Sequence, residues 1–149
     1  MELDALAPAD IAEVMRIERL PGYEATVGRF EAGEHADQLA RADVRYFGLR
    51  EAAGLAGFVI LQELDQPTVL LRRIAVSQVE RGVGTQLVRA VLDWVFVELS
   101  AEAVRLDVAT GNPRGRHVYE REGFEAYDRD DIHDLMRIPR ERWRALRGR

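Results

Sequence analysis

The strongest constraint on the fold is a change of hydrophobic period near residue 77. Before it, three apolar segments of strand length are separated by short turns: Val44–Arg50, Leu55–Leu64 and Thr68–Val76. After it, apolar residues recur at helical spacing over Gly82–Leu99, and another apolar strand follows at Val104–Ala109. Strands joined by short turns pair antiparallel, whereas a strand–helix–strand unit of this length crosses over to a parallel partner. The pattern therefore predicts a mixed sheet in an α/β or α+β fold.

Weaker patterns predict the remaining elements of a single domain over residues 1–149. A chain of 149 residues has the usual size of one domain, and it contains no repeat and no linker. In chain order, we expect a strand at Glu2–Leu6, a helix opened by Pro8 and ended by Pro21, one or two short helices within 23–42, a helix at Pro113–Glu122, closing strands at Phe124–Tyr127 and Ile132–Ile138, and an arginine-rich tail after Pro139.

Composition excludes several classes of function. The chain has no cysteine, and all 21 of its basic residues are arginine. It therefore lacks a thiolate nucleophile, and it lacks the lysine that Schiff-base enzymes and Walker-type nucleotide phosphatases need. The histidines, His35, His117 and His133, have no metal-ligand spacing and are typical of surface residues, so we expect no metal.

Net charge and hydropathy limit which partners and which cellular location we expect for the protein. A net charge of −5 disfavours nucleic acid as a partner. No apolar run reaches the ~18 residues of a membrane span, and the acidic N-terminal stretch does not read as a signal peptide. We therefore expect a cytoplasmic protein with no membrane partner.

The loop at residues 77–84 is the first candidate binding site. Its sequence, Ser-Gln-Val-Glu-Arg-Gly-Val-Gly, joins a predicted strand to a predicted helix. Glycines at such a turn let a ligand approach the backbone, and the amides of the first helical turn favour an anion. By itself this signal is weak, because any tight helix start produces it. A generic nucleotide-phosphate turn therefore stays an alternative.

A second motif lies beyond the next strand. Asn112 precedes a predicted helix that carries the run Val118-Tyr119-Glu120-Arg121-Glu122-Gly123-Phe124. Together with Arg81-Gly82-Val83-Gly84, in this order and spacing, these residues resemble the GNAT N-acetyltransferase superfamily, over about residues 44–138. The chain departs from the family pattern at Val79, where members carry Gln or Arg. That position contributes mainly backbone to pyrophosphate binding, so we interpret the change as tolerable, with side-chain help to the pyrophosphate expected from Arg81 instead.

The resemblance implies a cosubstrate and a place for it. It implies that the parallel strands 68–76 and 104–109 splay apart between flanking helices, in a sheet that is mostly antiparallel, and that acetyl-CoA lies in the resulting cleft. The pantetheine arm would pair with the backbone of Ile74 and Val76, and Asn112 would help to hold the cosubstrate. The pyrophosphate would lie on the turn formed by Arg81, Gly82, Val83, Gly84 and Thr85.

The resemblance also implies catalytic roles. The Val76 N–H would stabilise charge on the thioester carbonyl, and Tyr119 would protonate the leaving thiolate, which suits a phenol of pKa ~10. The alternative for Tyr119 is a core residue of an amphipathic helix, and the alternative for Asn112 is a turn initiator. Phe124 is expected in the core.

Two carboxylates are candidates for the general base. Asp107 interrupts an otherwise apolar strand, where a carboxylate is costly unless it is paired or used. The alternative for Asp107 is a charge pair with Arg72 or Arg73. Glu63 is the second candidate, and its alternative is an exposed charge at the end of a strand. Acidic stretches within 24–37 and 128–131 would suit a cationic amine, or they are simply solvated loops.

The resulting prediction is an acetyl-CoA-dependent N-acetyltransferase. The acceptor would be a small amine, or the N-terminal or lysine amine of a peptide. The alternative is a non-catalytic acyl-CoA-binding module of the same fold. Phe96 and Val97 lie away from the main apolar stripe of the long helix and suggest a second contact, such as a homodimer.

Overall fold

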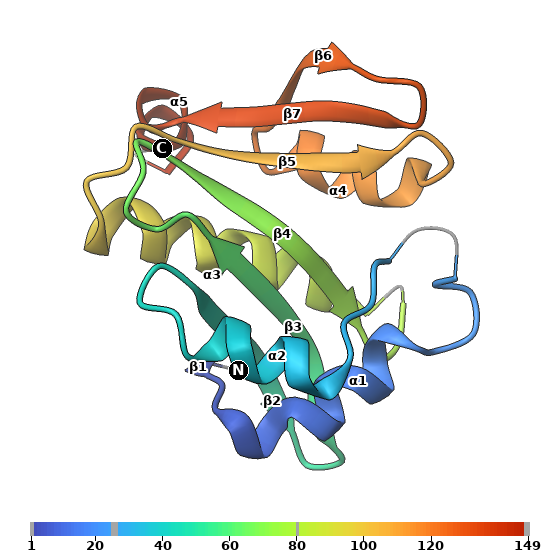
Figure 1. Cartoon of the computed structure of the whole chain (residues 1–149). Helices are drawn as coiled ribbons and strands as arrows, with labels where there is room; N and C mark the ends of the chain where they lie inside the picture. The colour runs from blue at the N-terminus through green and yellow to red at the C-terminus, as the bar shows by residue number, and fades with distance from the viewer. Residues whose placement is uncertain (1, 25–26, 80, 148–149) are drawn as a thin grey trace.

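The computed structural model describes residues 2–24, 27–79 and 81–147, and shows one mixed sheet with helices on both faces (Figure 1). The strands lie in the order β1-β2-β3-β4-β5-β7-β6, and only β4 and β5 pair in parallel. In chain order the elements are β1 (Leu3–Ala5), a short 3-10 helix (Pro8–Asp10), α1 (Ile11–Glu18), α2 (Ala32–Leu39), β2 (Arg45–Glu51), β3 (Gly54–Gln62), β4 (Thr68–Val76), α3 (Val83–Glu98), β5 (Ala103–Ala109), α4 (Pro113–Arg121), β6 (Glu125–Arg129), β7 (His133–Pro139) and α5 (Arg140–Arg147). No helix of the described residues is long and apolar enough to span a membrane.

The middle strands are buried on both faces, which explains their nearly continuous apolar sequence. Residues 55–61 of β3 are all buried, with α1 and α2 covering one face and α3 the other (Figure 1). A Cβ atom on Gly57 would lie 2.8 Å from Leu87 Cδ1 of α3 and 3.0 Å from the Ala75 carbonyl oxygen. Glycine at this position therefore lets the long helix lie close to the sheet.

A β-bulge in β4 opens the sheet. Residues 60 and 61 of β3 pair with residues 73 and 71 of β4, which leaves Arg72 as the extra residue. A bulge bends its strand and increases the local twist. Pairing between β4 and β5 is limited to Thr68–Leu70, before the bulge. Beyond that point the two parallel strands diverge, as Figure 1 shows.

The arginine-rich tail forms a helix, which the sequence pattern did not predict. The Trp143 ring of α5 lies 5.2 Å from the Phe96 ring. The Arg140 guanidinium donates to the carbonyls of Phe96, Leu99 and Ala101 at 2.6, 2.8 and 2.8 Å, near the end of α3 where carbonyls lack helical partners. Phe96 is thus buried within its own chain, and the expectation that it faces a second subunit is wrong. The homodimer stays a prediction without this side chain.

A buried polar network holds α1 and α2 on the sheet. The fully buried Glu18 carboxylate lies 2.8 Å from His35 Nε2 and accepts from Arg73 Nη1 at 3.2 Å. His35 Nδ1 lies 2.6 Å from the Tyr46 hydroxyl. Burial opposes ionisation of Glu18, but the hydrogen bonds and charges of His35, Arg19 and Arg73 outweigh it, so the pKa of Glu18 is lowered. His35 is therefore a core residue, and the expectation of a surface histidine is wrong for it.

Candidate active site

A cleft of about 1030 Å³ lies where β4 and β5 diverge. Its walls are the end of β4, the loop that leads into α3, the start of α4, and residues 20–23 and 27 after α1. The predicted site residues that line it are Ile74, Val76, Gly82, Val83, Gly84, Thr85, Asn112 and Tyr119. Arg81, Asp107 and Glu63 are not among the residues that form its walls. The bulge at Arg72 therefore creates the space that brings the separate motifs together.

Helix α3 begins at the cleft with a left-handed glycine. Gly82 has φ 77° and ψ 4°, a conformation that residues with a side chain disfavour. Among the residues that the structure describes, no side chain caps the helix, and its first internal bond runs from the Gln86 N–H to the Gly82 carbonyl at 3.1 Å. The amides of the first turn, Val83 to Thr85, therefore have no helical partner and can bind an anion. The Arg81 side chain instead contacts Glu51 and Gln78, so its help to an anion stays a prediction.

The walls of the cleft favour negative charge. Arg114 and Arg121 line it from α4, and no described lining residue is acidic. The N-terminal end of α3 adds a partial positive charge. The Asn112 side chain accepts from the Gly115 N–H at 3.0 Å and caps α4. Asn112 is therefore a helix cap, a structural role that differs from the turn initiator given as its alternative, while its contact with a cosubstrate stays a prediction.

The edge of β4 that faces the cleft is occupied by Tyr23, a residue that the sequence reasoning missed. The Ser77 N–H donates to the Ala56 carbonyl of β3, so the peptide groups of Val76 point to the opposite edge. There the Tyr23 hydroxyl accepts from the Val76 N–H at 3.1 Å and donates to the Val76 carbonyl at 2.7 Å. No sequence signal could have joined residues that lie 53 positions apart.

Tyr119 places its ring in the core and its hydroxyl at the cleft. The residue is 8% exposed, and its ring packs edge-to-face on Phe124, which is a core residue as predicted. Among the described residues, no group hydrogen-bonds with this hydroxyl, and no fully buried side-chain oxygen lacks a partner. The hydroxyl must therefore be accessible from the cleft. Burial, with a smaller contribution from nearby Tyr23, raises the pKa of Tyr119 above its usual range, so the phenol stays protonated.

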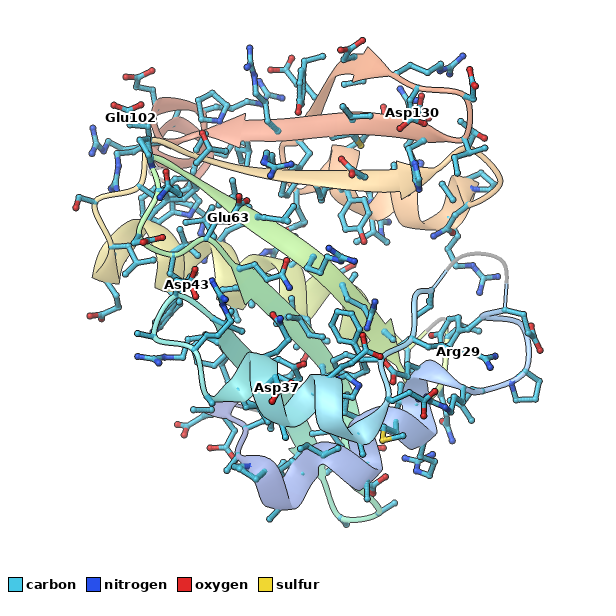
Figure 2. The ribbon with its side chains drawn as sticks, viewed as in Figure 1. Arg29, Asp37, Asp43, Glu63, Glu102 and Asp130 are labelled. Carbon is cyan, nitrogen blue, oxygen red and sulfur yellow. The ribbon has the colours of Figure 1, made fainter. Side chains whose placement is uncertain are left out.

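The two predicted bases lie outside the cleft walls. Asp107 is exposed on β5, and no described residue forms an ion pair with it. Arg73, an alternative partner of Asp107, pairs with Glu18 instead. Glu63 pairs with Arg105 at 2.8 Å, and Figure 2 shows it beside the first half of β4, toward the end that is still paired with β5. A base role for either carboxylate stays a prediction and needs water between it and the acceptor.

The loops around the open end of the cleft carry charge of both signs. Figure 2 shows Asp130 and Arg29 on two loops on the side where β4 and β5 diverge. The Asp130 carboxylate accepts from the amides of Ile132 and His133 at 2.9 and 2.7 Å, so it shapes its own loop. Among the described residues, no group of three or more His, Asp or Glu side chains is placed to hold a metal ion.

Solved structures of other proteins share this fold over their full length. Spermidine N-acetyltransferase SpeG from Vibrio cholerae, in complex with CoA and spermine, has a TM-score of 0.80 and 20% identity, covering 95% of this chain and 96% of that one. AAC(6')-Ib, in complex with paromomycin and acetyl-CoA, has a TM-score of 0.82 and 18% identity, covering 98% of this chain and 97% of that one. At such identities the likeness shows the fold alone.

Sequence comparison identifies the family. No curated protein matches the sequence significantly. The profile described as the Acetyltransferase (GNAT) family matches residues 12–124, which include the bulged strand, the α3 turn and Tyr119. The chain therefore belongs to the GNAT family of acetyltransferases.

Proposed function

We propose that this acetyltransferase moves the acetyl group of acetyl-CoA to a primary amine by direct attack in a ternary complex. The observation that carries the proposal is the cleft, which combines a strand edge, an anion-binding helix start and an unpaired phenol hydroxyl. The strand edge can pair with an extended, amide-containing arm, the helix start can bind a pyrophosphate, and the hydroxyl can donate a proton. The amine ligands of the two structural neighbours, spermine and paromomycin, support an amine acceptor.

The residues of this chain then act as a template for the transfer. Acetyl-CoA supplies an activated acyl group on a thiol. The backbone of Ile74 and Val76 orients the arm along β4, and the amides of Val83, Gly84 and Thr85 hold the pyrophosphate. The Val76 N–H is a preorganised dipole aimed at the carbonyl oxygen on which negative charge develops. Tyr119, kept neutral by burial, gives its proton to the leaving sulfur.

Removal of the proton from the acceptor ammonium needs a route out of the cleft. None of the described lining residues is Asp, Glu or His. We therefore assign the first proton transfer to water in the cleft, with Asp107, exposed on the neighbouring strand, as the predicted carboxylate that receives the proton from such water. This assignment favours acceptors whose amine is already partly neutral at the working pH.

The test is release of free CoA, followed with a thiol reagent, across a panel of amines. The chain has no cysteine, so the protein gives no background signal. The panel should contain a polyamine, an aminoglycoside, an aryl-alkyl amine, and peptides with a free N-terminus or a lysine. We expect thiol release that depends on both the enzyme and one class of amine. Binding of acetyl-CoA without amine-dependent release from any member would favour the non-catalytic alternative.

A further inference from the structure

Tyr23 lies where the proposed cosubstrate must bind. Its hydroxyl engages both peptide groups of Val76, accepting at 3.1 Å and donating at 2.7 Å. Under the proposed function, on which this inference rests, the cosubstrate needs the same groups, because its arm pairs along β4 and its thioester carbonyl accepts from the Val76 N–H. We propose that Tyr23 is a gating residue of the acetyl-CoA site, and that acetyl-CoA binds by displacing the Tyr23 hydroxyl from Val76.

A hydroxyl is well suited to hold this strand edge in the free protein. Because β5 has diverged, the Val76 N–H and carbonyl have no neighbouring strand to pair with. Unpaired backbone groups are costly when they are taken out of water. A phenol hydroxyl is both donor and acceptor, so one oxygen satisfies both groups. The incoming cosubstrate offers the same pair of functions, an amide N–H donor in its arm and a carbonyl acceptor in its thioester, and the two occupants are therefore mutually exclusive.

Two backbone hydrogen bonds tie Tyr23 to other residues of the cleft wall. The Tyr23 N–H donates to the Leu20 carbonyl at 3.2 Å, and the Val27 N–H donates to the Tyr23 carbonyl at 2.9 Å. All three residues line the cleft. Displacement of the hydroxyl therefore moves a wall of the cleft as well as freeing the strand edge.

The chain directly after these residues is held much more strongly. The Arg73 guanidinium lies 4.3 Å from the centre of the Phe30 ring, and Arg19 donates to the Phe30 carbonyl at 2.9 Å. Both arginines pair with the buried Glu18 carboxylate. Charge-assisted hydrogen bonds are roughly twice as strong as neutral ones, so the neutral contacts of Tyr23 are the weaker anchor. Phe30 therefore stays in place while Tyr23 moves.

Calorimetric titration of CoA into three proteins tests the gate: wild type, Tyr23→Phe, and Tyr127→Phe as the matched control. Tyr127 is 41% exposed on β6 and does not line the cleft. The apparent Kd equals the intrinsic Kd divided by the fraction of protein whose strand edge is free. Removal of the Tyr23 hydroxyl increases this fraction and therefore lowers the apparent Kd. From the worth of one or two neutral hydrogen bonds, Tyr23→Phe should bind CoA about 3- to 30-fold tighter. The control should bind like wild type.

A melting curve on the same proteins separates gating from a merely structural role. The free Tyr23→Phe protein should melt at or below the wild-type temperature, because it loses contacts, and yet bind CoA more tightly. Equal or weaker binding by a folded Tyr23→Phe protein would overturn the gate. Tyr23→Leu repeats the comparison if the phenylalanine variant does not fold. A wild type that binds no CoA overturns the proposed function itself, which is a distinct result.

Discussion

The Tyr119 hydroxyl gives the sharpest test of the proposed chemistry. Tyr119→Phe removes one oxygen and keeps the ring that packs on Phe124. Because no described group hydrogen-bonds with that oxygen, its loss leaves no hydrogen-bonding group unsatisfied. We therefore expect the free energy of unfolding to change by less than about 0.5 kcal/mol. Acetyl-CoA affinity should also change little, because the proton moves only in the transition state.

Turnover should respond very differently from stability. A positioned general acid contributes about 10²–10⁴-fold, so kcat should fall by that factor, which equals about 2.7–5.5 kcal/mol of transition-state stabilisation. The assay is steady-state release of CoA with the best acceptor, beside a chemical denaturation curve on the same preparation. The loss should shrink with an acidic aryl thioester, whose thiolate leaves without a proton. Tyr127→Phe, on exposed β6, controls for the loss of a tyrosine hydroxyl.

Near-normal turnover in a well-folded Tyr119→Phe enzyme would falsify the acid role. Tyr119 would then be a core residue whose hydroxyl happens to reach the cleft. A large loss of stability, with turnover per folded molecule unchanged, would lead to the same conclusion. Neither result would touch the assignment of the cosubstrate site, because that rests on the Val83–Thr85 amides and the β4 edge.

Three further predictions address the anion site, the base and the buried network. Acetyl-CoA at 100 times its Kd should stabilise the wild-type protein by about 2.7 kcal/mol, and Gly84→Leu should remove this stabilisation because the leucine side chain enters the cleft. Gly33→Leu, at an exposed position of α2, should keep the stabilisation. A full thermal shift in the Gly84→Leu protein would refute the assignment of the phosphate turn. Asp107→Asn should lower kcat less than about 10-fold if water is the first proton acceptor, and a loss of 10²-fold or more would make Asp107 the base itself. The lowered pKa of Glu18 in the folded state means that its contribution to stability is present above about pH 4.3 and is lost as pH falls further, through the lowered pKa. Urea denaturation at pH 7 and at about pH 3 should show this loss, and a Glu18→Gln protein with the same pH dependence would contradict it.

The helices and strands whose apolar residues recur at a regular spacing were predictable from the sequence. The strand expected at Thr68–Val76 is β4, residue for residue, and the helix expected at Gly82–Leu99 is α3 with one residue fewer at each end. Such elements bury a face or both faces, so the apolar spacing along the chain carries the information. The turn at Gly82 and the motif around Tyr119 were likewise readable, because each is a local run of residue types.

The tertiary structure alone decided which of these residues meet and which polar side chains are buried. The tail offers only two large apolar side chains on one helical face, Trp143 and Leu146, and its helix depends on packing against α3, since short helices gain most of their stability from tertiary contacts. Tyr23 and Val76, or Glu18 and Arg73, are separated by more than 50 residues, and no local pattern encodes their pairing. A buried charge or hydroxyl is tolerated only when distant partners satisfy it. Sequence alone determined the strands and helices that have a strong hydrophobic periodicity, whereas tertiary packing determined the tail helix, the cleft beside the bulge at Arg72 and the tyrosine that occupies its edge.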